Sequence, residues 1–218
     1  GVQWKNMSNI KYIFFDFNGT LLNDVDLCLE LLNGLLRGQN KKEVTLEEYK
    51  NIFTFPIEEY YRRAGIDFNI ESFQSLSLKF IKEYQPRSLE CGLYLKVYET
   101  INKLRELGYH TYILSASEKN NLIEQCEHYK LLGLFDDILG IDDIHARSKV
   151  DIAINYCKNN NINSNEILFI GDTIHDYEVS KSIGAKCYLV SCGHQSKEVL
   201  GEANVPILNS IYDLLEEL

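Results

Sequence analysis

The sequence predicts an α/β fold, in which a doubly wound, Rossmann-like parallel sheet carries an inserted all-helical cap domain. The first observation is that short apolar runs alternate with amphipathic helical patterns; the runs lie at 11–17, 111–117, 166–172, 185–192 and 205–208. The second is that residues 23–88 show helical patterns with no strand run between them. We therefore expect a core made of residues 1–22 and 89–218 and a cap at 23–88.

The elements of the core follow from local patterns. Each apolar run is short and rich in β-forming residues, which is typical of a buried parallel strand. The helix before the second strand is indicated by four apolar residues that share one face, namely Leu93, Val97, Ile101 and Leu104. Gly108 ends this helix. Ser117 is a good N-cap for the next helix. Helical patterns at 148–159 and 174–184 flank the third strand.

The insertion contains four helical patterns. The first covers 24–38, and Thr45 with Glu48 forms a capping-box pattern at the start of the second. Pro56 suits the first position of the third helix. The fourth carries aromatic and aliphatic residues near helical spacing, namely Phe73, Leu76, Phe80 and Tyr84.

Composition narrows the class of protein. The 218 residues are 45% hydrophobic and 25% charged, which is ordinary for a globular domain, and the net charge is −10. We expect no binding to nucleic acid or anionic membrane, because no basic run occurs. The absence of a long apolar stretch indicates no membrane span. Six scattered cysteines without a C-x-x-C pair favour a reducing cytoplasm.

Polar side chains gather where the predicted strands end, which is where parallel sheets bind ligands. The first strand ends in Asp16, the second in Ser115 and the third in Asp172, with Asp176 four residues further on. Lys149 begins the helix before the third strand. Carboxylates at strand ends suit Mg²⁺, which prefers oxygen ligands.

The same edge offers donors for a phosphate. Ser115 and Lys149 can bind phosphate oxygens. Backbone N–H groups of Asn18, Gly19 and Ala116 would add further donors, and Thr20 belongs to the same phosphate cradle.

These residues carry a family resemblance. The chain resembles the haloacid dehalogenase-like superfamily, in its phosphatase branch with a helical cap, and is similar to phosphoglycolate phosphatases. The family's four motifs occur in order over nearly the whole chain: "DFNGT" with Asp16, "YILS" with Ser115, Lys149, and "GDTIHD" with Asp172 and Asp176.

The resemblance implies an Mg²⁺-dependent phosphatase whose partner is a small phosphorylated metabolite, working as a monomer or homodimer. Asp16 would attack phosphorus and form an aspartyl phosphate. Asp16, the main-chain carbonyl of Asn18 and Asp172 would hold the metal, and Asp176 would support it from beside. Ser115 and Lys149 would hold the phosphate, and the cap would select the substrate.

Asn18 departs from the pattern that the resemblance implies. Family phosphatases usually carry a second aspartate there, which protonates the leaving oxygen and then deprotonates water. An amide cannot transfer a proton near neutral pH, and a general acid/base is worth about 10²- to 10⁴-fold in rate. We expect a slowed enzyme in which alkoxide leaving groups suffer most and aryl or acyl phosphates least.

Four hypotheses about Asn18 stay open at this point. In the first, the chain is a native phosphatase that uses Asn18 with a good leaving group or with another acid. In the second, Asn18 is an engineered Asp-to-Asn change made to trap a bound state. In the third, the chain is a pseudoenzyme that binds a phosphorylated ligand, and in the fourth it catalyses another reaction of the superfamily. Phosphonoacetaldehyde hydrolysis is the example of the fourth, and it would need a cap lysine for a Schiff base. The cap holds Lys41, Lys42, Lys50, Lys79 and Lys82.

Other side chains are weaker candidates for the site. His175 lies in the fourth motif and His194 follows the fourth strand, so either could replace the missing acid/base. Arg62 or Arg63 could grip a substrate anion, although an exposed helical arginine is usually only solvated.

Overall fold

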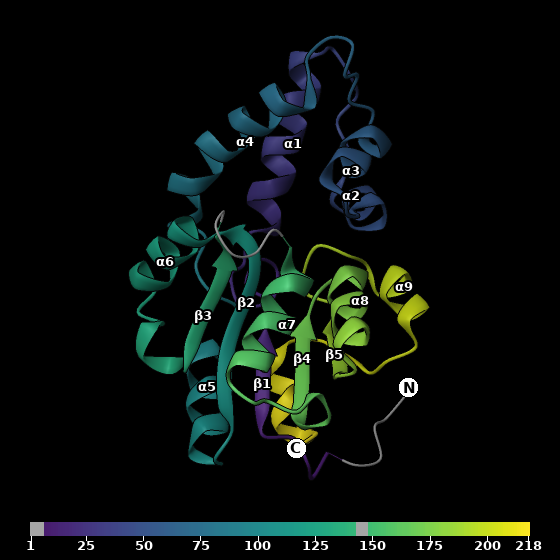
Figure 1. Cartoon of the computed structure of the whole chain (residues 1–218). Helices are drawn as coiled ribbons and strands as arrows, with labels where there is room; N and C mark the ends of the chain where they lie inside the picture. The colour runs from purple at the N-terminus through teal and green to yellow at the C-terminus, as the bar shows by residue number, and fades with distance from the viewer. Residues whose placement is uncertain (1–6, 143–147) are drawn as a thin grey trace.

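The computed structural model describes residues 7–142 and 148–218. Over these residues the chain forms a six-stranded parallel sheet in the order β3-β2-β1-β4-β5-β6 (Figure 1). The strands are β1 Tyr12–Phe15, β2 His110–Glu118, β3 Asp137–Ile141, β4 Ile167–Gly171, β5 Lys186–Val190 and β6 Ile207–Leu208. The predicted α/β fold class is confirmed, and β1 and β4 lie side by side at the centre.

Helices cover both faces of this sheet. The α-helices of the core are α5 Val97–Glu106, α6 Lys119–His128, α7 Lys149–Asn159, α8 Ile174–Ile183 and α9 Lys197–Leu200. Short 3₁₀ helices are η1 Leu132–Leu134, η2 Ser164–Glu166, η3 Gly201–Ala203 and η4 Ile211–Glu216. Among the described helices, none is both long and apolar enough to cross a membrane.

The two faces are set by alternation along the strands. In β1, Ile13 and Phe15 pack into the cluster formed with α5, α6 and η4. Phe14 points the other way and packs with residues of α7 and α8. Because side chains alternate across a strand, a run that is apolar on both faces needs a helical layer on each.

The segment 23–88 folds as four helices, which we call the helical insert. They are α1 Val25–Gly38, α2 Leu46–Ile52, α3 Ile57–Ala64 and α4 Phe73–Ser88. The insert has its own buried cluster rich in aromatic residues. It stands beyond the carboxyl ends of the strands, toward which the arrows point in Figure 1.

Hydrogen bonds tie the insert to the core beside the sheet edge. Lys50 Nζ donates to the carbonyl oxygen of Ser191 at 3.0 Å. Gln195 Nε2 donates to the carbonyl oxygen of Phe53 at 2.8 Å, and Gln195 Oε1 accepts from Ile174 N at 2.7 Å. The insert is therefore held directly over the end of β4 and the start of α8.

Several element boundaries differ from the sequence prediction. The helix expected from Leu93 begins at Val97, because Lys96 takes a left-handed conformation just before it. Ser117 does not cap α6; β2 runs on to Glu118, whose carboxylate accepts from the N–H groups of Asn120 and Asn121. Pro56 is the N-cap of α3 rather than its first residue.

One strand was missed, and one helix start was predicted well. β3 is an edge strand that pairs only with β2 in the described sheet, and only Ile138 and Gly140 of its five residues are buried, so its apolar pattern is weaker than that of the central strands. The capping box of α2 is confirmed, with Glu48 N donating to Thr45 Oγ1 at 3.1 Å.

Candidate active site

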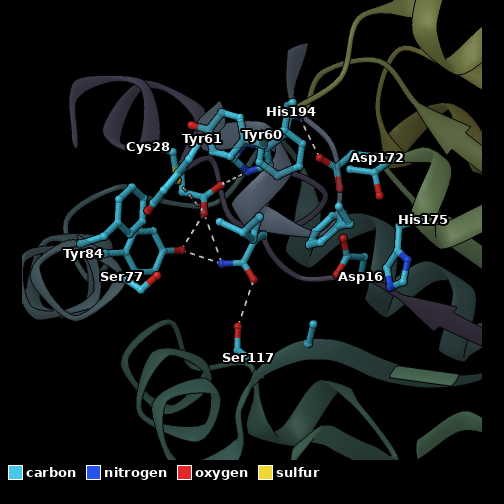
Figure 2. Close-up of a pocket in the computed structure, with 18 of the residues that line it drawn as sticks. Asp16, Cys28, Tyr60, Tyr61, Ser77, Tyr84, Ser117, Asp172, His175 and His194 are labelled. Atoms are coloured by element: carbon cyan, nitrogen blue, oxygen red, sulfur yellow. Dashed lines mark hydrogen bonds and ion pairs between the residues drawn. The ribbon is translucent and has the colours of Figure 1, made fainter. Parts of the chain in front are cut away.

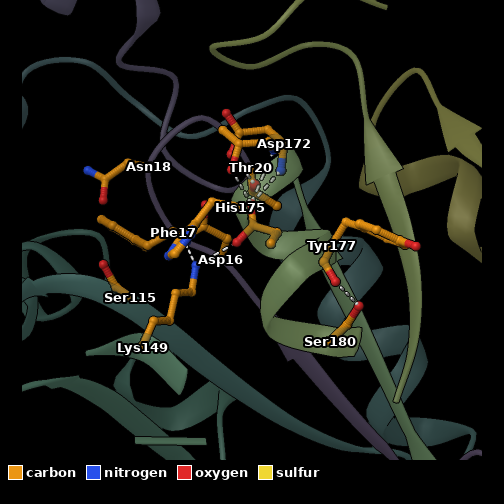
Figure 3. A network of polar contacts seen from close by, with 12 residues as sticks. Asp16, Phe17, Asn18, Thr20, Ser115, Lys149, Asp172, His175, Tyr177 and Ser180 are labelled. Carbon is orange, nitrogen blue, oxygen red and sulfur yellow. Dashed lines mark hydrogen bonds and ion pairs between the residues drawn. The ribbon is translucent and has the colours of Figure 1, made fainter. Parts of the chain in front are cut away.

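One ammonium and two carboxylates meet beyond the ends of β1 and β4. Lys149 Nζ donates to Asp16 Oδ1 at 2.9 Å, as Figure 3 shows. It also donates to Asp176 Oδ1 at 2.6 Å. Asp16 directly follows β1, Asp176 lies in the first turn of α8, and Lys149 opens α7. Parallel topology thus brings together residues more than a hundred positions apart in the chain.

Burial and crowding set the charges of this group. Burial, with the charge of Asp176, raises the pKa of Asp16 well above its usual value, and Lys149 only partly offsets this rise. Burial alone would lower the pKa of Lys149, but Asp16 and Asp176 together raise it. The pKa of Asp176 is lowered, because Lys149 outweighs the cost of its burial.

Asp172 is held by the surrounding loops. Thr20 Oγ1 donates to Asp172 Oδ1 at 3.1 Å, and the N–H of His194 donates to Asp172 Oδ2 at 2.8 Å. Burial raises the pKa of Asp172. These hydrogen bonds fix the orientation of the carboxylate, and its burial makes the charged form unfavourable unless a cation is bound nearby. Both properties suit a cation ligand.

Asp176 organises the start of α8 as well as the charge cluster. Its Oδ2 accepts from the N–H groups of Asp172 and Thr173, both at 3.1 Å. A Cβ atom at Gly171 would lie 2.2 Å from this carboxylate, so the glycine before Asp172 is needed for close approach.

Gly19 and Thr20, the predicted phosphate-cradle residues, both form hydrogen bonds within the surrounding loops. The Gly19 N–H donates to the carbonyl oxygen of Leu22 at 2.9 Å, inside the turn. Gly19 is needed because its φ is +77° and a Cβ there would lie 2.2 Å from Asp172 Oδ2. The Thr20 hydroxyl donates to Asp172 Oδ1 and so helps to position that carboxylate.

Asn18 is fixed by three side chains. Its Nδ2 donates to the hydroxyl of Tyr84 at 2.6 Å and to Asp24 Oδ2 at 3.2 Å. Its Oδ1 accepts from Ser117 Oγ at 3.2 Å. Figure 2 shows Tyr84 and Ser117 at the two sides of this network. The amide is therefore oriented by both of its ends.

Behind Asn18 lies a buried ion pair. His194 Nε2 is 2.9 Å from Asp24 Oδ1, and both residues are almost fully buried. Burial alone would lower the pKa of His194, but Asp24 raises it above its usual value. Burial alone would raise the pKa of Asp24, yet His194 and the hydroxyl of Tyr84 lower it. Each partner thus shifts the pKa of the other toward its charged form.

The model of the haloacid dehalogenase-like hydrolase family matches residues 13–190. The chain belongs to the haloacid dehalogenase-like hydrolases. The resemblance and the enzyme class predicted from the four motifs are confirmed.

Relatives of this haloacid dehalogenase-like hydrolase match it end to end. A pyrophosphatase PpaX of Bacillus mycoides is 27% identical, covering 94% of this chain and 95% of the relative. A phosphoglycolate phosphatase of Aliivibrio fischeri is 21% identical, covering 95% of each. The structure of a haloacid dehalogenase-like family hydrolase from Streptococcus pneumoniae superposes with a TM-score of 0.81 at 17% identity, covering 96% of this chain and 98% of that one.

The acids of this hydrolase fit a divalent cation. Carboxylate oxygens of Asp16, Asp172 and Asp176 lie within 4.8 Å of one another. With Lys149 as the ammonium among them, the group has an excess of about two negative charges. Oxygen donors and that charge suit Mg²⁺ better than a softer metal.

The remaining predicted residues differ in whether they are buried, line the cavity or are exposed. Ser115 is buried and its hydroxyl donates to Ser117 Oγ at 3.0 Å, while Ala116 and Ser117 line the cavity above Asp16. His175 also lines the cavity, and burial lowers its pKa. Arg62 and Arg63 are not in that lining; both are exposed and form ion pairs with glutamates of α3.

Sequence reasoning missed Asp24 and Tyr84 and gave His194 little weight. Asp24 reads as one acid among several at the start of α1, and Tyr84 as one of many aromatic residues of the insert. Only the contact between α1, α4 and the loop after β5 makes them a network with Asn18. A histidine a few residues after the end of a strand was the one available signal.

Proposed function

We propose that the protein is an Mg²⁺-dependent phosphatase that hydrolyses a small phosphomonoester through an aspartyl phosphate on Asp16. The observation that carries this is the pairing of Lys149 with Asp16 and Asp176 beside Asp172. Phosphatase activity of this family agrees with the relatives named as phosphoglycolate phosphatase and pyrophosphatase.

In this mechanism Asp16 is the nucleophile. Lys149 Nζ and the N–H of Phe17 both donate to Asp16 Oδ1, at 2.9 and 2.8 Å, and so fix the rotation of its carboxylate. The P–O bond to the leaving group breaks as the bond from Asp16 to phosphorus forms. Water then attacks phosphorus and releases Asp16.

Lys149 and Ser115 serve the phosphate in this proposal. The ammonium of Lys149 offers charge to a phosphate oxygen, and its raised pKa keeps it protonated throughout. Ser115 either turns its hydroxyl from Ser117 to the phosphate or acts through Ser117, which lines the cavity.

Asp16, the main-chain carbonyl of Asn18 and Asp172 would hold Mg²⁺, with Asp176 beside them. The bound ion would neutralise charge on the phosphate oxygens. Asp172 is kept in position for this by Thr20 and by the N–H of His194. We also propose the helical insert, 23–88, as a substrate-selecting cap; cytoplasmic location and a monomeric or homodimeric state stay predictions.

Asn18 lowers the expected rate, because this position supplies no proton to the leaving oxygen. Its amide is held by Tyr84, Asp24 and Ser117 and cannot give or take a proton. The leaving oxygen therefore departs without a proton from this position. A slowed phosphatase follows, with the nucleophile and the phosphate clamp intact.

A binding role without turnover is the second candidate, and the fixed amide of Asn18 is the observation that favours it. A Schiff-base reaction is less well supported, since the described lining of the cavity contains Lys149 but no lysine of the insert.

Phosphate release from acetyl phosphate and p-nitrophenyl phosphate, with and without Mg²⁺, tests the proposal. We expect Mg²⁺-dependent release that disappears in Asp16→Ala and persists in Asp26→Ala, an exposed acid of α1. Saturable binding of a phosphate ester with no release above Asp16→Ala would instead support the binding role.

A further inference from the structure

A cavity of about 350 Å³ lies between the helical insert and the carboxylates of the core (Figure 2). Asp16, Lys149 and Asp172 line it at the core side. The insert lines it mainly with aromatic side chains, among them Phe53, Tyr60, Tyr61, Phe73, Phe80 and Tyr84. A phosphate at Asp16 would thus have its leaving group among aromatic rings.

The cationic groups of the described lining are all committed. Lys149 bonds to two carboxylates, and Nε2 of His194 lies 2.9 Å from Asp24 Oδ1. His175 is engaged as well, since its ring packs against Phe55 and its Nδ1 lies 3.9 Å from Glu178 Oε2. A second anionic group on the substrate would therefore be buried among rings with no cation to pair with, which is costly.

The cavity does offer one neutral polar group. The hydroxyl of Tyr60 is buried and has no hydrogen-bond partner among the described residues. Burial raises the pKa of Tyr60 well above its usual value, so the phenol stays uncharged. It can bond to an uncharged oxygen of a substrate but gives no charge to a carboxylate.

The leaving group must also suit Asn18. Without a proton donor there, the electron pair of the broken P–O bond stays on the leaving oxygen as it departs. A phenol has a pKa of about 10, far below that of water at about 15.7. A phenolate is thus a much better leaving group than an alkoxide at this site.

We infer that the substrate of this site is an aryl phosphate whose ring carries no further charge. This rests on the proposed phosphatase function and adds the substrate class. The aryl–O–P bond breaks as Asp16 bonds to phosphorus, and the phenolate takes a proton from water. Water then cleaves the aspartyl phosphate, so one aryl phosphate dianion and one water give one phenol and one hydrogen phosphate.

A panel of phosphate substrates tests separately the effects of the aromatic ring, the leaving group and a second anionic group. Phenyl phosphate has the ring and the good leaving group, benzyl phosphate has the ring and an alkoxide, acetyl phosphate has only the good leaving group, and phosphoglycolate and pyrophosphate carry a second anion. We expect kcat/KM for phenyl phosphate at least 100-fold above that for phosphoglycolate and pyrophosphate. Benzyl phosphate should match phenyl phosphate in KM within a few-fold and fall at least tenfold in kcat.

Substitutions at two exposed positions of α4 test whether the substrate's ring lies in the cavity. Ile81 is 49% exposed and lines the cavity, whereas Leu78, at 73%, is outside the lining. Both variants are expected to fold. Ile81→Lys supplies a cation and should raise the preference for phosphoglycolate over phenyl phosphate at least tenfold, and Leu78→Lys should leave it unchanged.

The outcomes distinguish this inference from the proposed function. If acetyl phosphate is hydrolysed through Asp16 but phenyl phosphate is no better than phosphoglycolate or pyrophosphate, the aryl assignment is wrong and the phosphatase stands. Equal behaviour of Ile81→Lys and Leu78→Lys would likewise overturn the placement of the ring. If no phosphate in the panel is released above Asp16→Ala, both conclusions are lost.

Discussion

Asn18→Asp is the most informative single change in this protein. In the parent, the amide donates to Asp24 Oδ2 at 3.2 Å and to the hydroxyl of Tyr84. An aspartate has no N–H to donate, so the variant would place two carboxylates at that distance. At an effective dielectric constant of about 20, two unit charges 3.2 Å apart repel by about 5 kcal/mol.

That repulsion is relieved when one carboxyl takes a proton. The pKa of one acid of the pair rises, as in shared carboxylate dyads. A proton at position 18 is what an alkoxide leaving group lacks in the parent. We therefore expect kcat for benzyl phosphate to rise by about 10²- to 10⁴-fold in Asn18→Asp. For p-nitrophenyl phosphate, whose leaving group needs no proton, the rise should stay below about tenfold.

The assay compares both substrates in the parent, in Asn18→Asp and in Asn23→Asp. Asn23 is exposed and outside the cavity lining, so this control adds the same charge without adding an acid at the site. Equal acceleration of the two substrates would refute the reasoning, since the gain would then not be proton transfer. So would an unchanged rate for benzyl phosphate in a folded variant.

Further predictions concern charge and stability. Lys149→Met leaves two buried carboxylates without a cation, so we expect a loss of about 3–5 kcal/mol at pH 7 in urea unfolding, smaller at acid pH where Asp16 is protonated. Mg²⁺ should raise the melting temperature of the parent, and this shift should vanish in Asp172→Ala, measured by scanning calorimetry. Asp24→Asn should lower the free energy of unfolding by about 3 kcal/mol near pH 6. Because the pKa of His194 is raised in the folded protein, this loss should shrink as the pH rises through that pKa. In a double-mutant cycle, Asn18→Asp and Asp24→Asn should couple by about 1–3 kcal/mol, the pair being less unstable than the sum of the single changes.

The chemistry at the strand ends could be predicted because it depends on local sequence and on topology together. Asp16 and Asp172 each follow a central apolar strand, and parallel strands bring their carboxyl ends to one edge. Lys149 could be placed because a helix start after Ser148 is visible in the sequence. Each of these signals lies within a few residues of the side chain concerned.

What could not be predicted depends on contacts between distant segments. Asp24 meets His194 across 170 positions, and nothing near either residue indicates the other. The turn after Asp16 also uses its N–H groups internally, which the pattern of glycine and threonine does not show. The edge strand β3 was missed because its run is short and only Ile138 and Gly140 of its five residues are buried.

The environment of Asn18 also bears on why an asparagine stands there. Tyr84 donates its own proton to Asp24 Oδ2 at 2.6 Å, so the oxygen of Tyr84 needs a donor, and the amide of Asn18 supplies it. Asp24 is already charge-balanced by His194, and a second carboxylate at position 18 would upset that balance. An amide satisfies both neighbours, whereas an ionised aspartate satisfies neither. The site is therefore complementary to asparagine, and an ionised aspartate at position 18 would require Tyr84 and Asp24 to change their hydrogen bonds.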